Sequence, residues 1–155
     1  MERMNEGLQH GARIGVGVVA LLMGWLVVTA AADPVTLSGS QEVPPVTTSM
    51  TGVADVSVIL TKCPSATSSS TDCPTVVGTV SVSGGAPTAV HVHLAPAGQN
   101  GPVIVPLVEQ GGVWVVAPGT TISKDQYQAW WDGKLYVNVH TAANPGGEVR
   151  AQLKR

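Results

Sequence analysis

The sequence predicts an all-β fold, a sandwich or barrel of short strands with one short helix. The chain of 155 residues contains 18 Gly and 11 Pro, only 12% of its residues are charged, and its apolar residues are mostly Val and Ala rather than Leu. This composition favours strands and turns over helices. Short apolar runs separated by turn signals support the same fold class. The length is that of one domain once a targeting segment is removed.

Eight segments have the composition of strands, and turn signals lie between them. The expected strands cover residues 35–37, 52–60, 75–83, 88–94, 104–107, 113–116, 135–140 and 148–153. The breaks between them fall at residues such as 84–85, 100–101 and 145–147. Eight short strands are typical of a sandwich or barrel.

One helix is expected at residues 124–132. Ser123 can cap its N-terminus, and Gln126 three positions later completes a capping box. Gly133 stands where a left-handed residue would end the helix. Trp130 and Trp131 are interpreted as packing this helix onto the sandwich, and the alternative is an exposed Trp that serves a partner.

The first 32 residues differ from the rest of the chain. A polar start with Arg3 and Arg13 precedes the apolar run 14–28 and small residues that end in Ala-Ala-Ala before Asp33. This order is that of a secretory signal peptide with an A-x-A cleavage site. We therefore expect a mature domain at 33–155 that is secreted or periplasmic. The alternative is an uncleaved membrane anchor at 12–32, long enough to span a bilayer, and only then would the protein meet a membrane.

Cys63 and Cys73 are the only cysteines, and they flank a stretch rich in Ser and Thr. In an oxidising compartment such a pair closes a loop as a disulfide, which would stabilise the fold by about 2 to 3 kcal/mol. A metal role is less expected for them, since no His is nearby and the spacing is not C-x-x-C.

Charge and motifs exclude several function classes. A formal net charge of −2 gives no basic patch for nucleic acid. The sequence has no G-x-S-x-G elbow, no phosphate-binding Gly loop and no helical H-E-x-x-H. The sequence therefore lacks the motifs that would indicate a hydrolase, a nucleotide-binding protein or a zinc protease.

Three histidines share one facing. Alternation along residues 88–94 puts His91 and His93 opposite the apolar face, and in residues 135–140 the same rule puts Tyr136, Asn138 and His140 on the polar face. If the two strands are neighbours, the three imidazoles converge on one outer patch. Neutral nitrogen donors on a rigid sheet suit copper or zinc. The alternative is a solvated polar face.

Other residues could join this patch. Glu42 and Glu148 are candidates for a carboxylate ligand or for a group that orients an imidazole. Met50 is more simply explained by packing than as a copper ligand. Glu148 and Arg150 face the same way, and a solvated strand edge is the expectation for both.

Three stretches carry a resemblance to a known family. "LSGSQEVPPVTTSMTGVADV", "HVHLAPAGQNGPVIVPL" and "GKLYVNVHTAANPGGEVRAQL" resemble the CHRD domain, named after chordin and found also in exported bacterial proteins. The likeness covers nearly all of 35–153. It implies an immunoglobulin-like or superoxide-dismutase-like Greek-key fold, through a limited similarity to copper and zinc superoxide dismutases, and it implies no general biochemical function. Leu94 replaces the usual Gly after the H-x-H pair, and the loop between the cysteines looks like an insertion.

The sequence thus predicts an exported domain that binds one transition-metal ion, copper before zinc, through His91, His93 and His140. The alternative is a metal-free protein-binding or adhesion module that uses flat β faces or the Trp130 and Trp131 surface. Histidines too far apart to share an ion would favour this module. A superoxide-dismutase-like enzyme is a minor alternative, because the familiar copper site of four histidines cannot be built from three.

Overall fold

The computed structural model describes residues 32–63 and 72–155. The expected signal peptide (1–32) and the alternative membrane anchor (12–32) lie outside the described residues, except for Ala32, the last residue of both. No helix in the described part of the chain has the length and apolar character needed to cross a membrane.

All eight expected strands are present. Their bounds are β1 Val35–Leu37, β2 Thr51–Lys62, β3 Asp72–Ser83, β4 Ala89–Leu94, β5 Val103–Gln110, β6 Val113–Val116, β7 Leu135–His140 and β8 Val149–Gln152. A short 3₁₀ helix, η1 (Gly39–Gln41), was not expected. Strands β2 and β3 are longer than predicted, because they pair without interruption from Thr51 with Ser83 to Lys62 with Asp72.

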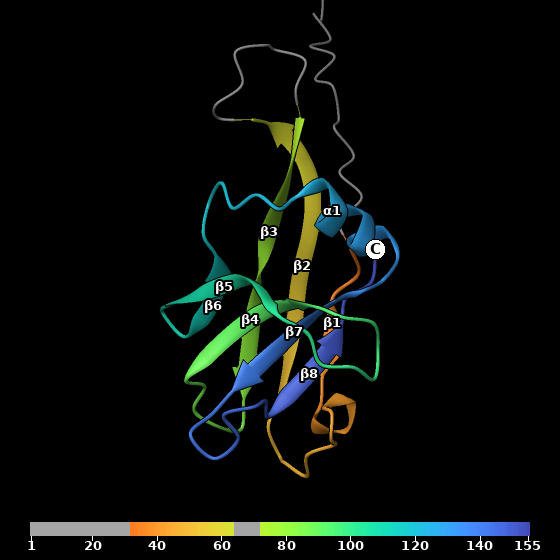
Figure 1. Ribbon diagram of the computed structural model, residues 1–155. Coiled ribbons are helices and arrows are strands. Elements are labelled where there is room, and N and C mark those ends of the chain that lie inside the picture. The colour runs from red at the N-terminus through yellow and green to blue at the C-terminus, as the bar shows by residue number, and fades with distance from the viewer. Residues whose placement is uncertain (1–31, 64–71) are drawn as a thin grey trace, which may run out of the picture.

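Within the described residues the strands form one antiparallel sheet in the order β1-β2-β3-β6-β5-β4-β7-β8. The β3–β6 and β4–β7 neighbours are not consecutive in the chain, which is the connectivity of Greek keys. Two backbone hydrogen bonds, both 3.1 Å, join Ser38 after β1 to Arg150 in β8. This bridge brings the two ends of the sheet together into a nearly closed barrel, in which β4, β7 and β8 cross in front of β2 and β3 (Figure 1).

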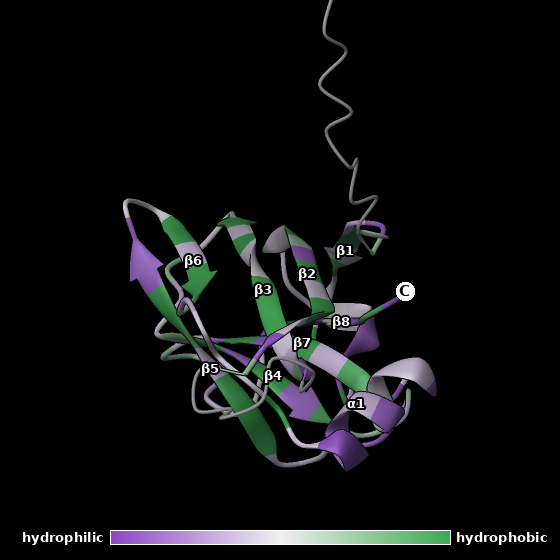
Figure 2. Cartoon of the chain, turned by 90° about the horizontal axis from the view of Figure 1, so that it is seen from above, coloured by the Kyte–Doolittle hydropathy of each residue, from purple (hydrophilic) through white to green (hydrophobic). Residues whose placement is uncertain are grey.

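The core follows from alternation along the strands. Apolar and polar bands alternate along β2 and β3 (Figure 2), as expected for strands with one buried face. The fully buried side chains of the core are mostly valines: Val56, Val76, Val80, Val90, Val92, Val105, Val137 and Val139. Met50 is 5% exposed and belongs to this core, which confirms packing as its role.

Helix α1 (Lys124–Trp131) has the predicted capping box. The Ser123 Oγ accepts from the Gln126 N–H at 3.1 Å, and Gln126 Oε1 accepts from the Ser123 N–H at 2.9 Å. Gly133 follows with φ 66°. Trp130 packs against the core at 5% exposure, whereas Trp131 is 45% exposed. The packing role is therefore confirmed for Trp130, and it is wrong for Trp131.

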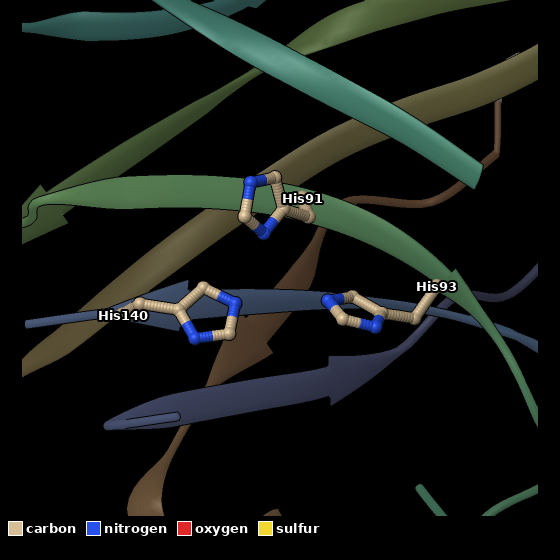
Figure 3. A group of neighbouring side chains, drawn as sticks. All are labelled: His91, His93 and His140. Atoms are coloured by element: carbon tan, nitrogen blue, oxygen red, sulfur yellow. The ribbon is translucent and has the colours of Figure 1, made fainter. Parts of the chain in front are cut away.

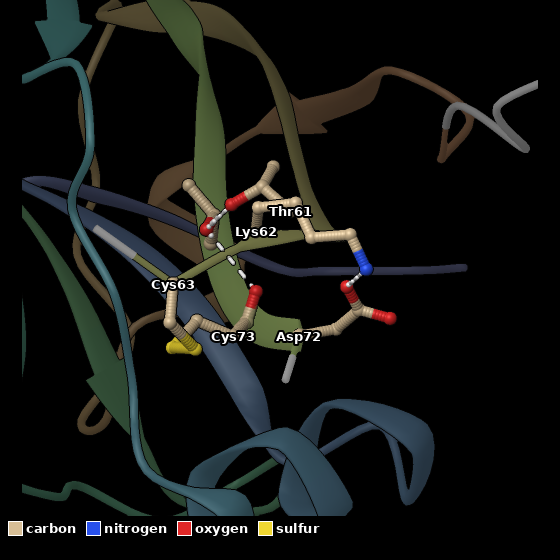
Figure 4. Close-up of polar contacts among 6 residues, drawn as sticks. Thr61, Lys62, Cys63, Asp72 and Cys73 are labelled. Atoms are coloured by element: carbon tan, nitrogen blue, oxygen red, sulfur yellow. Dashed lines mark hydrogen bonds and ion pairs between the residues drawn. A yellow bond between two sulfur atoms is a disulfide. The ribbon is translucent and has the colours of Figure 1, made fainter. Parts of the chain in front are cut away.

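Cys63 and Cys73 form the predicted disulfide, with their Cα atoms 5.0 Å apart. It closes the end of the β2–β3 hairpin (Figure 4). Beside it the Lys62 Nζ lies 2.7 Å from the Asp72 Oδ1. The hairpin end is thus held by a covalent bond and by an ion pair between exposed side chains.

Candidate metal centre

The three histidines come from two neighbouring strands. β4 and β7 pair antiparallel, with Ala89 opposite His140 and His91 opposite Asn138, which confirms the expectation that the strands are neighbours. Residues opposite one another, and those two positions along, share a face. His91, His93 and His140 therefore gather over the same part of the sheet (Figure 3). One ring nitrogen from each lies within 4.8 Å of the others.

Backbone carbonyls fix the tautomer of two of these rings. The Nδ1 of His93 lies 2.9 Å from the carbonyl oxygen of Gly101, and the Nδ1 of His140 lies 3.0 Å from that of Pro145. A carbonyl oxygen can only accept, so each Nδ1 carries the hydrogen. The Nε2 of each ring is left with a lone pair. Metal-bound histidines are oriented by this kind of second hydrogen bond.

The nitrogens that remain are buried and have no hydrogen-bond partner among the described residues. They are Nδ1 of His91, Nε2 of His93 and Nε2 of His140. Buried polar atoms in proteins are almost always paired, so three unpaired nitrogens in one cluster require an explanation. A metal ion bound by all three lone pairs would satisfy them together.

Burial favours the neutral form of two of the rings. Desolvation is the largest effect on the pKa of His91, and the positive charges that His140 and His93 would carry lower it further. Desolvation also lowers the pKa of His93, against the raising effect of the Gly101 hydrogen bond. Neutral imidazole is the form that binds metal.

The spacing of the nitrogens fits a shared ion after a small closure. Ligands at about 2.0 to 2.1 Å from one ion can be at most about 4.2 Å apart, and the nitrogens here lie within 4.8 Å. The widest pair needs to close by at least about 0.6 Å, and by more if its two ligands do not lie on opposite sides of the ion. Three imidazoles are donors suited to copper and to zinc.

The residues around this group match a known family. The model of the CHRD domain matches residues 34–153, which include all three histidines. The chain belongs to the CHRD domain family. Comparison with curated proteins and with solved structures found no match. The likeness to superoxide dismutases thus stays an expectation from sequence.

The polar face that carries the histidines in this CHRD domain is not a solvated outer surface. Tyr136 is 1% exposed, Asn138 2% and His93 7%. The loop after β4 covers this face and is fixed to the segment after η1, since Asn100 Nδ2 donates to the Val43 carbonyl at 2.7 Å. The expectation of an outward, solvated face is therefore wrong for these three residues. His91 and His140, in contrast, are partly exposed. Alternation predicts which residues share a face but not what covers it.

Arg150 is also buried, at 1% exposure, and so is Glu148, at 8%. The solvated edge expected for both is wrong. The Arg150 guanidinium donates to the backbone oxygens of Gln99, at 2.8 Å, and Pro96, at 3.4 Å, and to the side chains of Asn100 and Gln152. Carbonyl groups of the covering loop thus replace the water that the guanidinium would otherwise bind.

Tyr136 lies between this cation and the histidine group. The Arg150 Cζ is 3.4 Å from the centroid of the Tyr136 ring. On the neighbouring strand the His93 ring stacks on Tyr136, with centroids 4.9 Å apart and planes inclined by 15°. β7 separates β4 from β8 in the sheet, so the three side chains form a stack across three strands.

The two candidate carboxylates lie outside the histidine group. Glu42 is 5% exposed, and its Oε2 accepts a long hydrogen bond of 3.5 Å from Asn138 Nδ2. Desolvation raises the pKa of Glu42 to about 7, against the lowering effects of Arg150 and Asn138. Glu148 accepts from Thr141 at 2.8 Å and from Asn144, and hydrogen bonds from Thr48, Asn144 and Thr141 lower its pKa.

Sequence reasoning missed the residues that support the site. Arg150 and Gly101 were not singled out as parts of it, and Tyr136 and Asn138 were placed on the polar face without a role. Tyr136 and Asn138 could have been assigned a role from the sequence, because they alternate with His140 along one strand and so lie on the same face. Nothing in the pattern around Arg150 shows that a distant loop buries it.

Proposed function

We propose that this CHRD domain is an exported module that binds one transition-metal ion, copper before zinc, through His91, His93 and His140. The observation that carries the proposal is the set of three buried ring nitrogens with no partner among the described residues. A structural polar cluster would pair these atoms with protein donors or acceptors. A shared ion accounts for all three at once.

Copper is favoured over zinc by the donor set. Imidazole nitrogens bind both ions, and at a given nitrogen site the affinity for Cu²⁺ exceeds that for Zn²⁺. The protein supplies the orientation, because the backbone oxygens of Gly101 and Pro145 hold the rings of His93 and His140. A bound ion would supply a Lewis-acid or one-electron centre at this place.

Export is supported by chemistry outside the histidine group. The Cys63–Cys73 disulfide is stable in oxidising compartments such as the periplasm or the extracellular space. Membership of the CHRD family is consistent with an extracellular location. The order of residues at the N-terminus supports a signal peptide, which completes the proposal of a secreted or periplasmic protein.

A protein-binding or adhesion module is the second candidate, and the 45% exposed Trp131 on α1 favours it. Histidines too far apart to share one ion would favour this module over a metal-binding domain. Their nitrogens instead lie within 4.8 Å of one another. A superoxide-dismutase-like activity is a minor alternative. Scavenging of superoxide by the metal-loaded protein would support it.

The test is metal stoichiometry. The protein purified from a periplasm is loaded with Cu(II) or Zn(II), dialysed and analysed for bound metal, alongside His93→Ala and His140→Ala. We expect about one equivalent for the native chain and loss of it in both variants. Glu109→Gln, which changes an exposed side chain on β5, is the matched control and retains the metal. Equal uptake by all four proteins would refute the site.

A further inference from the structure

A buried positive charge lies one aromatic ring away from the histidine group. The Arg150 guanidinium rests on the Tyr136 ring, and the other neighbour of that ring is His93. Arg150 is 1% exposed, so little solvent separates its charge from the rings. Charges buried in this way are screened much less by salt than charges at a surface.

No carboxylate neutralises this cation directly. In the part of the chain that the structure describes, ion pairs join Lys62 to Asp72 and Lys134 to Asp132, and Arg150 takes part in neither. Its hydrogen bonds go to neutral oxygens of Pro96, Gln99, Asn100 and Gln152. The charge of the guanidinium therefore acts on its surroundings without an adjacent counterion.

The histidine group has no anionic member either. Within the described residues the cluster holds His91, His93 and His140 and no Asp, Glu or Cys. Its free nitrogens are buried. No ligand would neutralise either charge of a divalent ion bound here, and the site is weakly polar and already close to the positive charge of Arg150. The cost of burying charge rises steeply with the size of the charge, so a monovalent ion is penalised far less.

We propose that Arg150, acting across Tyr136, makes the histidine group favour the cuprous ion over the cupric ion and over Zn²⁺. Arg150 touches no ligand atom; it is an electrostatic residue that sets the oxidation state held by the site. This inference rests on the proposed function, since it concerns the metal bound by the same three histidines. It adds that the domain holds or carries reduced copper.

Among the described residues, Glu42 is a carboxyl group whose negative charge can offset the charge of Arg150. Burial raises the pKa of Glu42 to about 7, so this carboxyl is ionised at pH 8 and largely protonated at pH 6. Glu42 has no contact with a histidine among the interactions described. Its replacement by Gln therefore removes a negative charge without removing a ligand.

The test compares the affinities of the loaded protein for the two oxidation states. Cu(II) is reduced to Cu(I) by one electron from an external reductant such as ascorbate, and competition with chelators specific for each ion gives the ratio of the two affinities. For Arg150→Met at pH 8 we expect the ratio of Cu(I) to Cu(II) affinity to fall at least tenfold, equivalent to about 59 mV in reduction potential.

Two further variants control for packing. Arg150→Lys keeps the charge and restores the ratio to within threefold of the native value, whereas a structural role of the planar guanidinium predicts no such rescue. Lys134→Met removes an exposed cation from an ion pair at the surface and leaves the ratio unchanged. If Arg150→Met does not fold, Glu42→Gln at pH 8 carries the test, with the ratio expected to rise.

The outcomes separate the two proposals. Absence of copper binding in the native chain overturns the proposed function. Copper binding with the same affinity ratio in native, Arg150→Met and Glu42→Gln proteins leaves the metal site in place and overturns the role of Arg150. Tighter binding of Zn(II) than of Cu(I) by the native chain also overturns it.

Discussion

The carbonyl oxygen of Gly101 lies 2.9 Å from the Nδ1 of His93, and it comes from the loop that covers the histidine face. The N–H of the same Gly101 donates to the Tyr136 hydroxyl at 3.0 Å. One peptide segment thus orients a candidate ligand and the ring that stacks on it. The loop can approach this closely because Gly101 has no side chain: a Cβ there would overlap the Leu94 carbonyl oxygen.

Replacement of Gly101 by Ala should weaken metal binding. The new methyl group pushes the loop away from Leu94, and the hydrogen bond that orients His93 is lost. Loss of such an orienting partner lowers metal affinity about 10- to 100-fold, and overpacking costs about 1 to 3 kcal/mol in the free energy of unfolding. Competition titration with a chelator and urea denaturation measure the two effects.

Gly146→Ala is the matched control for Gly101→Ala. Nothing lies within 4 Å of a Cβ placed at Gly146, so affinity and stability should stay close to the native values. A Gly101→Ala protein that binds metal as tightly as the control would show that the Gly101 carbonyl does not position His93.

The burial of Glu42 should make stability depend on pH. Burial raises the pKa of Glu42 from 4.5 to about 7, so between these values the folded state binds more protons than the unfolded state. The contribution is fully present below pH 4.5 and is lost as pH rises through about 7. At about 1.36 kcal/mol for each pKa unit, the loss amounts to about 3 kcal/mol.

Glu42→Gln should abolish this dependence, because Gln stays neutral at every pH. The free energy of unfolding of the variant, relative to the native chain, should rise by about 3 kcal/mol between pH 4.5 and pH 8. Urea denaturation at both values measures it. A constant difference between the two proteins would show that Glu42 titrates normally in the fold.

The strand pattern was sufficient to predict most of the strands and the common face of the histidines, whereas their meeting depended on the condition that β4 and β7 are neighbours, which the structure confirms. Alternation in β4 and β7 placed Val90, Val92, Val137 and Val139 inside, and all four are fully buried. The same rule gave His91, His93 and His140 a common facing. The Greek-key order came only through the family resemblance, because alternation carries no information on which strands are neighbours.

The cover over the histidine face could not be predicted. Arg150 reads as a surface residue because Arg is seldom fully buried. It is buried here by carbonyl oxygens of the loop after β4, about fifty positions away in the chain. Long-range contacts of this kind depend on loop conformation, which composition does not determine. The sequence also did not predict the full length of β2 and β3, for a related reason. Lys62 and Asp72 are not residues typical of strands, and it is their pairing with each other that extends the two strands to these residues.

Removal of the disulfide should lower stability without affecting metal uptake. The double variant Cys63→Ser, Cys73→Ser frees a short loop, at a cost of about 2 to 3 kcal/mol in the free energy of unfolding. The histidines lie on β4 and β7, which are not neighbours of β2 or β3 in the sheet. Denaturation and metal analysis of the oxidised native chain and the variant test both statements, and a loss of metal stoichiometry would contradict the second.

The adjacent tryptophans of α1 should respond very differently to truncation. Trp130 is 5% exposed and packs in the core, so Trp130→Ala should lower the free energy of unfolding by about 3 to 5 kcal/mol. Trp131 is 45% exposed and contacts Tyr127 and the Arg155 guanidinium. Trp131→Ala should cost no more than about 1 kcal/mol, the worth of an exposed cation–π contact.

Chemical denaturation of the two variants, followed by circular dichroism, measures both values. Equal losses would show that Trp131 is as deeply packed as Trp130. Because Trp131→Ala is expected to remain folded, it also separates the two candidate functions: it should keep native copper uptake, whereas a module that binds a protein through this surface would lose its partner. Each function thus has a variant that impairs it and spares the other.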